Sequence, residues 1–493
     1  MKGYRLRGTG YGQSKKNDAR SRRKALMACV VAAALVSGCA TQVPPPRADI
    51  QKQALVNVNV DRPWKASTNA SAEQVQDDWL KSFNDPELDA LIREALANSP
   101  DLRVAAARVE QAGQYLAVAQ AALRPWVGIA GTGGAKSGGG SDPTSALQGI
   151  VLAASWELDL WGRVRYQRNA ARDTYLSAQS DFEFARQSLA AATAKSWFTA
   201  TQLALNTRIA ADSAAATRQL QGYAEERERV GVGTDAESAV ARAAALDADS
   251  TLREMELAQS QALRALELLI GRYPAAEVST RASLLALPGP TPVGVPLSML
   301  ERRPDVIAAE RRVAAAFNRV GEAKAARLPK ISLNANFGAF ESEILQLQED
   351  FENPTGGLGA RLVAPIYQGG ALTAQVEIRT LEQKEAVADY ARIALRAIGE
   401  VENALATSES LAARVGFLTR AVNEQTRAFE LTQTRAGIGR VDRRAVEQQR
   451  LSMNAAQVTL LNVRTEELMT RVNLHLALGG SFEVPQRQAE AQK

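Results

Sequence analysis

The chain has 493 residues, 46% hydrophobic and 23% charged, which is typical of a folded protein. Its formal charge of +5 comes from residues 1–38, which hold nine Lys or Arg and one Asp, so the rest of the chain carries −3 and is not a basic nucleic-acid-binding protein. A single histidine, His475, excludes a histidine triad or a multi-histidine metal centre within one chain, and no nucleophile–base pair or Gly-rich phosphate loop indicates an enzyme or a cofactor.

The chain begins with a lipoprotein-like leader. Basic residues 20–24 precede an apolar run, Ala25 to Val36, which is too short to span a bilayer and is typical of a signal peptide. The run ends in Leu35-Val36-Ser37-Gly38-Cys39, which resembles a lipobox. We therefore predict that Cys39 becomes the mature N-terminus and carries N-acyl and S-diacylglycerol lipid. The alternative is an ordinary cleavage site with a chance cysteine. The position after the cysteine is Ala40 and not an Asp, which would resemble an inner-membrane retention signal. This favours the outer membrane.

Two halves of the remaining chain repeat each other at offsets between 204 and 208 residues. Ser99-Pro100-Asp101-Leu102 and Arg303-Pro304-Asp305-Val306 each open a helix, and each half continues as strand, strand, long helix and returning helix. A period this long is a domain duplication, not a solenoid repeat. The predicted segments are the signal peptide 1–38, the anchor and equatorial segment 39–83, the repeats 84–272 and 297–480, the linker 273–296 and the tail 481–493.

Four segments alternate with a period of two, as strands with one apolar face do. They are Trp126 to Gly133, Leu147 to Trp161, Lys330 to Phe340 and Gly357 to Tyr367. Each is about as long as the 9–11 residues of a tilted membrane strand, although a soluble antiparallel sheet with one wet face shows the same pattern. The aromatic residues at strand ends predict a lipid-interface girdle or, alternatively, packing against equatorial helices; they are Trp126, Trp156, Trp161 and Tyr367.

The longest elements are two helices of about 67 residues, 162–230 and 370–436, each roughly 100 Å long if straight. Returning helices are predicted over 235–270 and 442–478. The turns between them are Gly-rich, and we expect Gly231, Gly233, Gly437 and Gly439 to supply positive φ angles. These turns are structural reversals, docking tips for a partner, or both. Arg229 and Arg435 complete the set of predicted tip contacts.

Sheet edges cannot face lipid, because their unpaired N–H and C=O groups find no water there. Four strands are too few to close a barrel, since membrane barrels begin at eight strands. The chain must therefore assemble, at least as a dimer with eight strands or a trimer with twelve.

Several segments resemble the outer-membrane efflux factors of the TolC superfamily, most closely the lipoprotein branch of NodT and OprM type. They are Trp79 to Leu88, Ser99 to Leu102, Trp156 to Val164, Arg302 to Val306 and Leu478 to Gly480. The resemblance implies a mixed α+β membrane protein: a homotrimeric tube with a twelve-stranded transmembrane β-barrel and a long α-helical periplasmic barrel. It also implies two partners, a periplasmic adaptor and an inner-membrane efflux pump, which in the family is often proton-driven and is expected here to be of the RND type. The function implied is the exit duct of a tripartite efflux system for small molecules such as drugs.

A resting tube must close, and the helices reverse only at the two tips. The family often has Asp six residues after the turn glycine of the second hairpin, where this chain has Arg443 beside Asp442, and Glu237 matches in the first hairpin. We expect Asp442 or Glu447 to pair with Arg440, Arg443 or Arg444 of a neighbouring hairpin. The alternative is that these residues are simply the water-solvated charges of a helix end.

Two other functions stay open at this point. The first is an outer-membrane duct for type I protein secretion, and the second is an anchored structural coiled coil without a pore.

Overall fold

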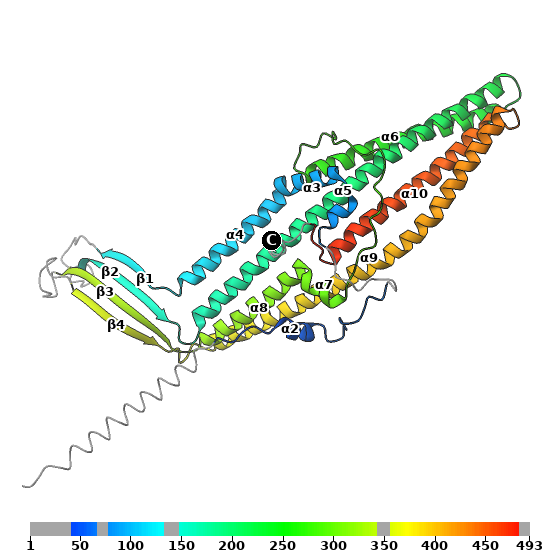
Figure 1. Cartoon of the computed structure of the whole chain (residues 1–493). Coiled ribbons are helices and arrows are strands. Elements are labelled where there is room, and N and C mark those ends of the chain that lie inside the picture. The colour runs from blue at the N-terminus through cyan, green and yellow to red at the C-terminus, as the bar shows by residue number, and fades with distance from the viewer. Residues whose placement is uncertain (1–40, 67–76, 133–146, 343–354, 483–493) are drawn as a thin grey trace, which may run out of the picture. The chain divides into compact units, whose positions relative to one another are not determined.

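The structure is a computed structural model that describes residues 41–66, 77–132, 147–342 and 355–482. The leader, Cys39 and parts of the predicted loops and tail lie outside these residues. Two short elements come first, α2 (Arg47–Ala54) and the 3₁₀ helix η1 (Trp79–Phe83). Figure 1 shows the order of the elements that follow.

The predicted duplication is visible in the order and length of the elements. The first copy comprises α3 (Pro86–Asn98), α4 (Pro100–Ala121), β1 (Trp126–Thr132), β2 (Leu147–Leu158), α5 (Arg163–Arg229) and α6 (Asp235–Leu269). The second comprises α7 (Pro296–Arg302), α8 (Pro304–Ala325), β3 (Lys330–Ser342), β4 (Thr355–Val363), α9 (Ala371–Gly437) and α10 (Arg443–Ala477). α4 and α8 both have 22 residues, α5 and α9 both have 67, and α6 and α10 both have 35.

Two strands end earlier than the alternation predicts, and each has a local cause. β2 stops at Leu158 because the Asp159 carboxylate accepts hydrogen bonds from the backbone N–H groups of Val164 (3.0 Å) and Arg165 (2.9 Å), which begins α5 instead. β4 stops at Val363, two residues before Pro365, which has no N–H to donate to a sheet. The predicted extensions to Trp161 and Tyr367 are therefore wrong.

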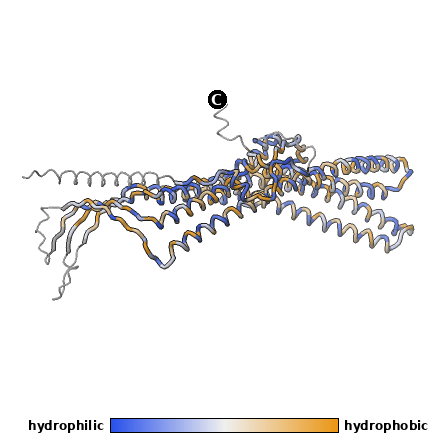
Figure 2. Tube along the Cα trace, turned by 90° about the horizontal axis from the view of Figure 1, so that it is seen from below, coloured by the Kyte–Doolittle hydropathy of each residue, from blue (hydrophilic) through white to orange (hydrophobic). Residues whose placement is uncertain are grey.

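The described residues form two compact units, and each draws on both copies of the repeat. The first contains the described residues within 41–50, 111–132, 147–176, 311–342 and 355–387, and holds the sheet. The second contains 51–110, 177–310 and 388–482, and holds both helical hairpin turns. Hydrophobic and hydrophilic positions are interspersed along the helices (Figure 2). Among the helices of the described residues, none combines the length and the hydropathy needed to cross a membrane.

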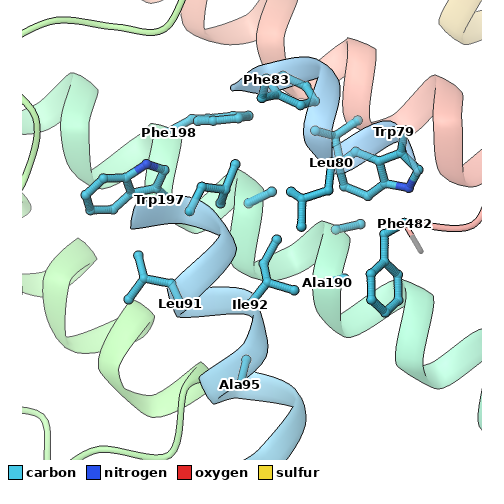
Figure 3. Close-up of a cluster of buried hydrophobic side chains, with 14 of the residues drawn as sticks. Trp79, Leu80, Phe83, Leu91, Ile92, Ala95, Ala190, Trp197, Phe198 and Phe482 are labelled. Carbon is cyan, nitrogen blue, oxygen red and sulfur yellow. The ribbon is translucent and has the colours of Figure 1, made fainter. Parts of the chain in front are cut away.

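The main hydrophobic core lies in the second unit, where η1 and α3 pack against α5 and the ends of α6 and α10 (Figure 3). Its aromatic members come from distant parts of the sequence; they are Trp79, Phe83, Trp197, Phe198 and Phe482. The Phe83 and Phe198 rings lie 5.5 Å apart, within the range of favourable aromatic pairs. Trp79 to Leu88, one of the segments that carry the family resemblance, therefore supplies several side chains of this core.

Asp85 holds this core to its surroundings through three different groups. Its carboxylate accepts a hydrogen bond from the Glu87 backbone N–H at 3.1 Å, and so caps α3. It also accepts from Trp197 Nε1 at 3.1 Å and from Arg281 Nη1 at 3.0 Å. A buried carboxylate is tolerated when charge and hydrogen bonds compensate it, so Asp85 ties α3, α5 and the linker together.

Candidate functional site

The four strands form one antiparallel sheet in the order β1-β2-β3-β4, and its register aligns their apolar side chains. One row across the sheet contains Val127, Ala154, Ala335 and Leu358, and the next contains Ile129, Leu152, Phe337 and Gly356. Neighbouring positions on the same face are Trp156, Leu333 and Ala360. The whole face is therefore apolar across all four strands.

This apolar face is open instead of covered by protein. Leu358 is 92% exposed, Ile129 75% and Phe337 54%. Exposed apolar surface of this extent marks a face that contacts another protein or a membrane.

The opposite face is polar or small. Ser155 Oγ lies 2.9 Å from Asn334 Oδ1 across β2 and β3, and Asn336 is on the same face. Toward the helices, Glu157, Ser332 and Arg361 share one row. One sheet thus separates a face suited to lipid from a face suited to water.

Within the described chain, both outer edges of the sheet lack a strand partner, since β1 pairs only with β2 and β4 pairs only with β3. Such edges present unpaired N–H and C=O groups. The site is therefore incomplete in a single chain.

The strand-end aromatic residues do not all share a face. Trp156 lies on the apolar face, and its Nε1 donates to the Leu123 carbonyl at 3.0 Å. Trp126 pairs with Ser155 and lies on the polar face, where its ring covers Gly128 so closely that a Cβ there would approach it to 2.5 Å. Trp126 therefore does not fit the predicted lipid girdle. The prediction rested on the position of Trp126 at a strand end, whereas alternation along β1 places it on the face opposite Val127 and Ile129.

The chain that follows Cys39 is held at the junction of β2 and α5. The Gln42 backbone N–H donates to Tyr166 Oη at 2.8 Å, and Thr41 sits over Gly162, whose φ is +75°. A Cβ at Gly162 would come within 2.6 Å of the Thr41 side chain. Cys39 itself lies outside the described residues, and residues 41 and 42 contact Gly162 and Tyr166 at the start of α5.

The hairpin tips are built with fewer positive φ angles than predicted. Gly231 (φ +78°) and Gly439 (φ +73°) adopt the left-handed conformation. Gly233 instead provides space, because a Cβ there would lie 3.0 Å from the Arg227 backbone. Gly437 is the last residue of α9, with no neighbour near its absent side chain. The expectation of positive φ at Gly233 and Gly437 is therefore wrong.

Two of the four candidate gate residues take part in helix capping. Glu237 forms a capping box with Thr234, in which each side chain bonds the other residue's backbone N–H at 3.2 Å. Asp442 caps α10 by accepting from the Arg444 N–H at 2.8 Å and from Arg444 Nε at 2.9 Å. The Arg444 hydrogen bonds hold the pKa of Asp442 below its usual value, so this carboxylate is ionised at neutral pH.

The other two candidates differ sharply in exposure. Glu447 is buried in α10, 3.5 Å from Arg450. Arg443 is exposed, and no ion pair or hydrogen bond engages its side chain among the described residues. Arg229 is already paired with Glu226 one turn earlier. The sequence located these charges but could not show which of them the helix ends use.

The linker 273–296 is fastened to α10 by two buried polar residues. Arg471 donates through Nη1 to the carbonyls of Pro288 (3.3 Å) and Gly289, and to Thr291 Oγ1 (3.2 Å). His475 lies one turn further on, with Nε2 3.2 Å from Thr291 Oγ1 and its ring stacked on Trp79 at 5.6 Å. Burial and the charge of Arg471 lower the pKa of His475 to about 3.

Among the described residues, no group of three His, Cys, Asp or Glu side chains is arranged to hold a metal ion.

The sequence model of the outer membrane efflux protein family matches this chain over residues 91–272 and 295–480. The chain belongs to the outer membrane efflux protein family. This is a family of transport channels and not of enzymes. The chain is accordingly an outer-membrane channel of an efflux system, with a mixed α+β fold that extends into the periplasm.

Individual relatives agree over nearly the full length. The chain is 31% identical to the pyoverdine export outer membrane protein OpmQ of Pseudomonas putida, covering 85% of this chain and 92% of the relative. It is 27% identical to the probable outer membrane lipoprotein SilC of Salmonella typhimurium, covering 91% and 97%. Among solved structures, the Campylobacter jejuni CmeC outer membrane channel aligns with a TM-score of 0.78 at 21% identity, covering 92% of this chain and 98% of CmeC.

We predict that His475 makes the stability of the protein depend on pH. Its folded pKa of about 3 lies below its unfolded value of about 6.5, so only the unfolded chain binds the proton between these values. The contribution of His475 to the free energy of unfolding is then fully present above pH 6.5. It is lost progressively as the pH drops toward 3, and the free energy of unfolding is lower by about 2 kcal/mol at pH 5. The measurement is denaturant unfolding of the detergent-solubilised protein at pH 7 and pH 5.

His475→Gln should abolish most of this loss, because His475 is the only histidine of the chain. An equal fall in unfolding free energy between pH 7 and pH 5 in both proteins would contradict the prediction.

Proposed function

We propose that three copies of this chain close one twelve-stranded barrel in the outer membrane, continued by their helices as a periplasmic duct for small molecules. The observation that carries the proposal is the sheet: an exposed apolar face, a polar face behind it and two free edges. In lipid those edges must pair, and pairing β1 of one chain with β4 of the next satisfies them. Three chains of four strands give an even-numbered barrel within the known range.

The partners in this proposal are a periplasmic adaptor and an inner-membrane pump of the RND type. Relatives named for efflux of toluene, of antibiotics and of cations, and for export of pyoverdine, support a duct for small solutes over one for secreted proteins. The adaptor would contact the tips formed by Arg229, Gly231, Gly233, Arg435, Gly437 and Gly439. The exposed side chains of Val232 and Ile438 at these turns add apolar contact area.

The membrane attachment in this proposal includes lipid on Cys39. The hydrogen bond of Gln42 to Tyr166, at the start of α5, supports it, because acyl chains on a residue three positions earlier could reach the bilayer that the proposed barrel spans. The relative SilC is itself named as a probable lipoprotein.

The proposed pore can be tested in planar bilayers. The purified protein should have the mass of three chains in native mass spectrometry and should open discrete conductance steps. Discrete steps are expected because a closed barrel has one fixed bore. A monomer or dimer in mild detergent, or insertion without conductance even by variants that lack the tip charges Asp442 and Arg443, would overturn the proposal.

We further propose that Arg443 and Asp442 belong to a ring of opposite charges that closes the tips. Glu237, in the capping box of α6, and Glu447, buried beside Arg450 in α10, would hold the helix ends that carry this ring. Asp442→Asn keeps the capping oxygen but removes the charge, and Arg443→Ala removes the exposed partner. Each should raise the conductance of the isolated trimer, because like charges around a threefold axis need opposite charges to stay closed.

Arg253→Ala is the matched control for the tip variants, since Arg253 is an exposed arginine of α6 paired with Glu256 within its own helix. Its conductance should equal that of the unmodified protein. If both tip variants also conduct like the unmodified protein, closure is located elsewhere.

A further inference from the structure

The polar face of the sheet carries its charge at one end only. Lys330 and Arg361 are exposed there, near the junction with the helices. The rest of the described face lacks charged side chains through the middle of the sheet; its members there include Gly128, Ala130, Ala153, Asn334, Asn336, Gly357 and Gly359. The charge is therefore a band and not a scatter.

Nearby carboxylates do not neutralise this band, because they are engaged elsewhere. Glu157 makes a two-pronged ion pair with Arg163, at 3.0 and 2.8 Å. Asp159 bonds the first N–H groups of α5 and pairs with Arg165 at 3.1 Å. The charge of each of these carboxylates is therefore balanced by an arginine of α5.

Lys330 and Arg361 have no such compensation. Within the residues that the structure describes, neither side chain forms an ion pair or a side-chain hydrogen bond. Arg361 lies directly across from Ser332, two pairs along from the pairing of Lys330 with Val363. Each chain therefore has two uncompensated positive charges that are diagonal neighbours on β3 and β4, on the polar face of the sheet.

We propose that Lys330 and Arg361 form a basic collar inside the duct that favours anionic cargo, such as carboxylate-bearing small molecules, over cations. The inference rests on the proposed trimer, which brings three copies of the pair around one lumen. A channel with low-dielectric walls focuses such a field and raises the local concentration of the opposite charge. Rings of Arg and Lys select anions in other pores by the same physics.

A cysteine reporter measures the potential at the collar directly, whatever the state of the periplasmic tip. The chain has only two cysteines, Cys29 in the leader and Cys39 at the expected lipid site, so Asn334→Cys introduces one clean thiol on the polar face. Its reaction rates with an anionic and a cationic methanethiosulfonate reagent of similar size are compared in lipid vesicles. The rate with the anionic reagent divided by the rate with the cationic reagent reports the local electrostatic potential.

The collar predicts that the anionic reagent is favoured, and that Lys330→Gln with Arg361→Gln lowers the rate ratio by at least about threefold. Arg361→Lys keeps the charge and should preserve the ratio. Raising the salt to about 1 M should lower the ratio in the protein with both basic residues, since the screening length falls to about 3 Å. The salt measurement needs no collar variant and so survives any folding defect. Arg253→Gln serves as the charge-removal control away from the sheet.

Failure of the collar and failure of the pore give different results. If Asn334→Cys reacts but neither salt nor the collar variants change the ratio, the collar is wrong and the pore stands. Ala335→Cys, on the apolar face, should react with neither charged reagent in lipid. If Ala335→Cys reacts and Asn334→Cys does not, the faces are reversed and the proposed function fails with the collar.

Discussion

The structure depends on one constraint: each chain makes four strands of a sheet that lipid would tolerate only if its edges were paired. The apolar rows from Val127 to Leu358 leave a hydrophobic face uncovered, and the outer edges of β1 and β4 leave backbone groups unbonded. Burying that face in hydrocarbon is favourable, whereas an open edge there costs several kcal/mol for each unsatisfied group. In the proposed trimer, assembly is thus part of the fold of the chain.

The second unit contains the hairpin turns and the main hydrophobic core. Duplication supplies two hairpins of equal length, 67 and 35 residues in each copy, so each chain contributes two matching helix pairs to the proposed duct. The core around Trp79 and Trp197 joins parts of both copies within the second unit, and Asp85 connects it to the linker through Arg281. Arg471 and His475 then hold the linker against α10.

Much of this architecture could be predicted from the sequence because it rests on periodicity. Alternation located all four strands, and the absence of proline located both long helices. What could not be predicted depended on competing local bonds. Asp159 ended β2 by capping α5, and Gly437 remained helical because Gly439 alone made the turn. At the tips, composition could not show that the Asp442 side chain caps α10 whereas the Arg443 side chain is exposed.

The most direct test of the central claim is disulfide pairing between the free edges. One cysteine would replace Ala130 in β1, and a second would be moved along β4 through Gly357, Leu358, Gly359 and Ala360. Closure between chains predicts covalent dimers and trimers on a non-reducing gel, with cross-linking strongest at Gly357 or Gly359, which share the polar face with Ala130. Monomers at every position, or equal cross-linking on both faces, would contradict the account.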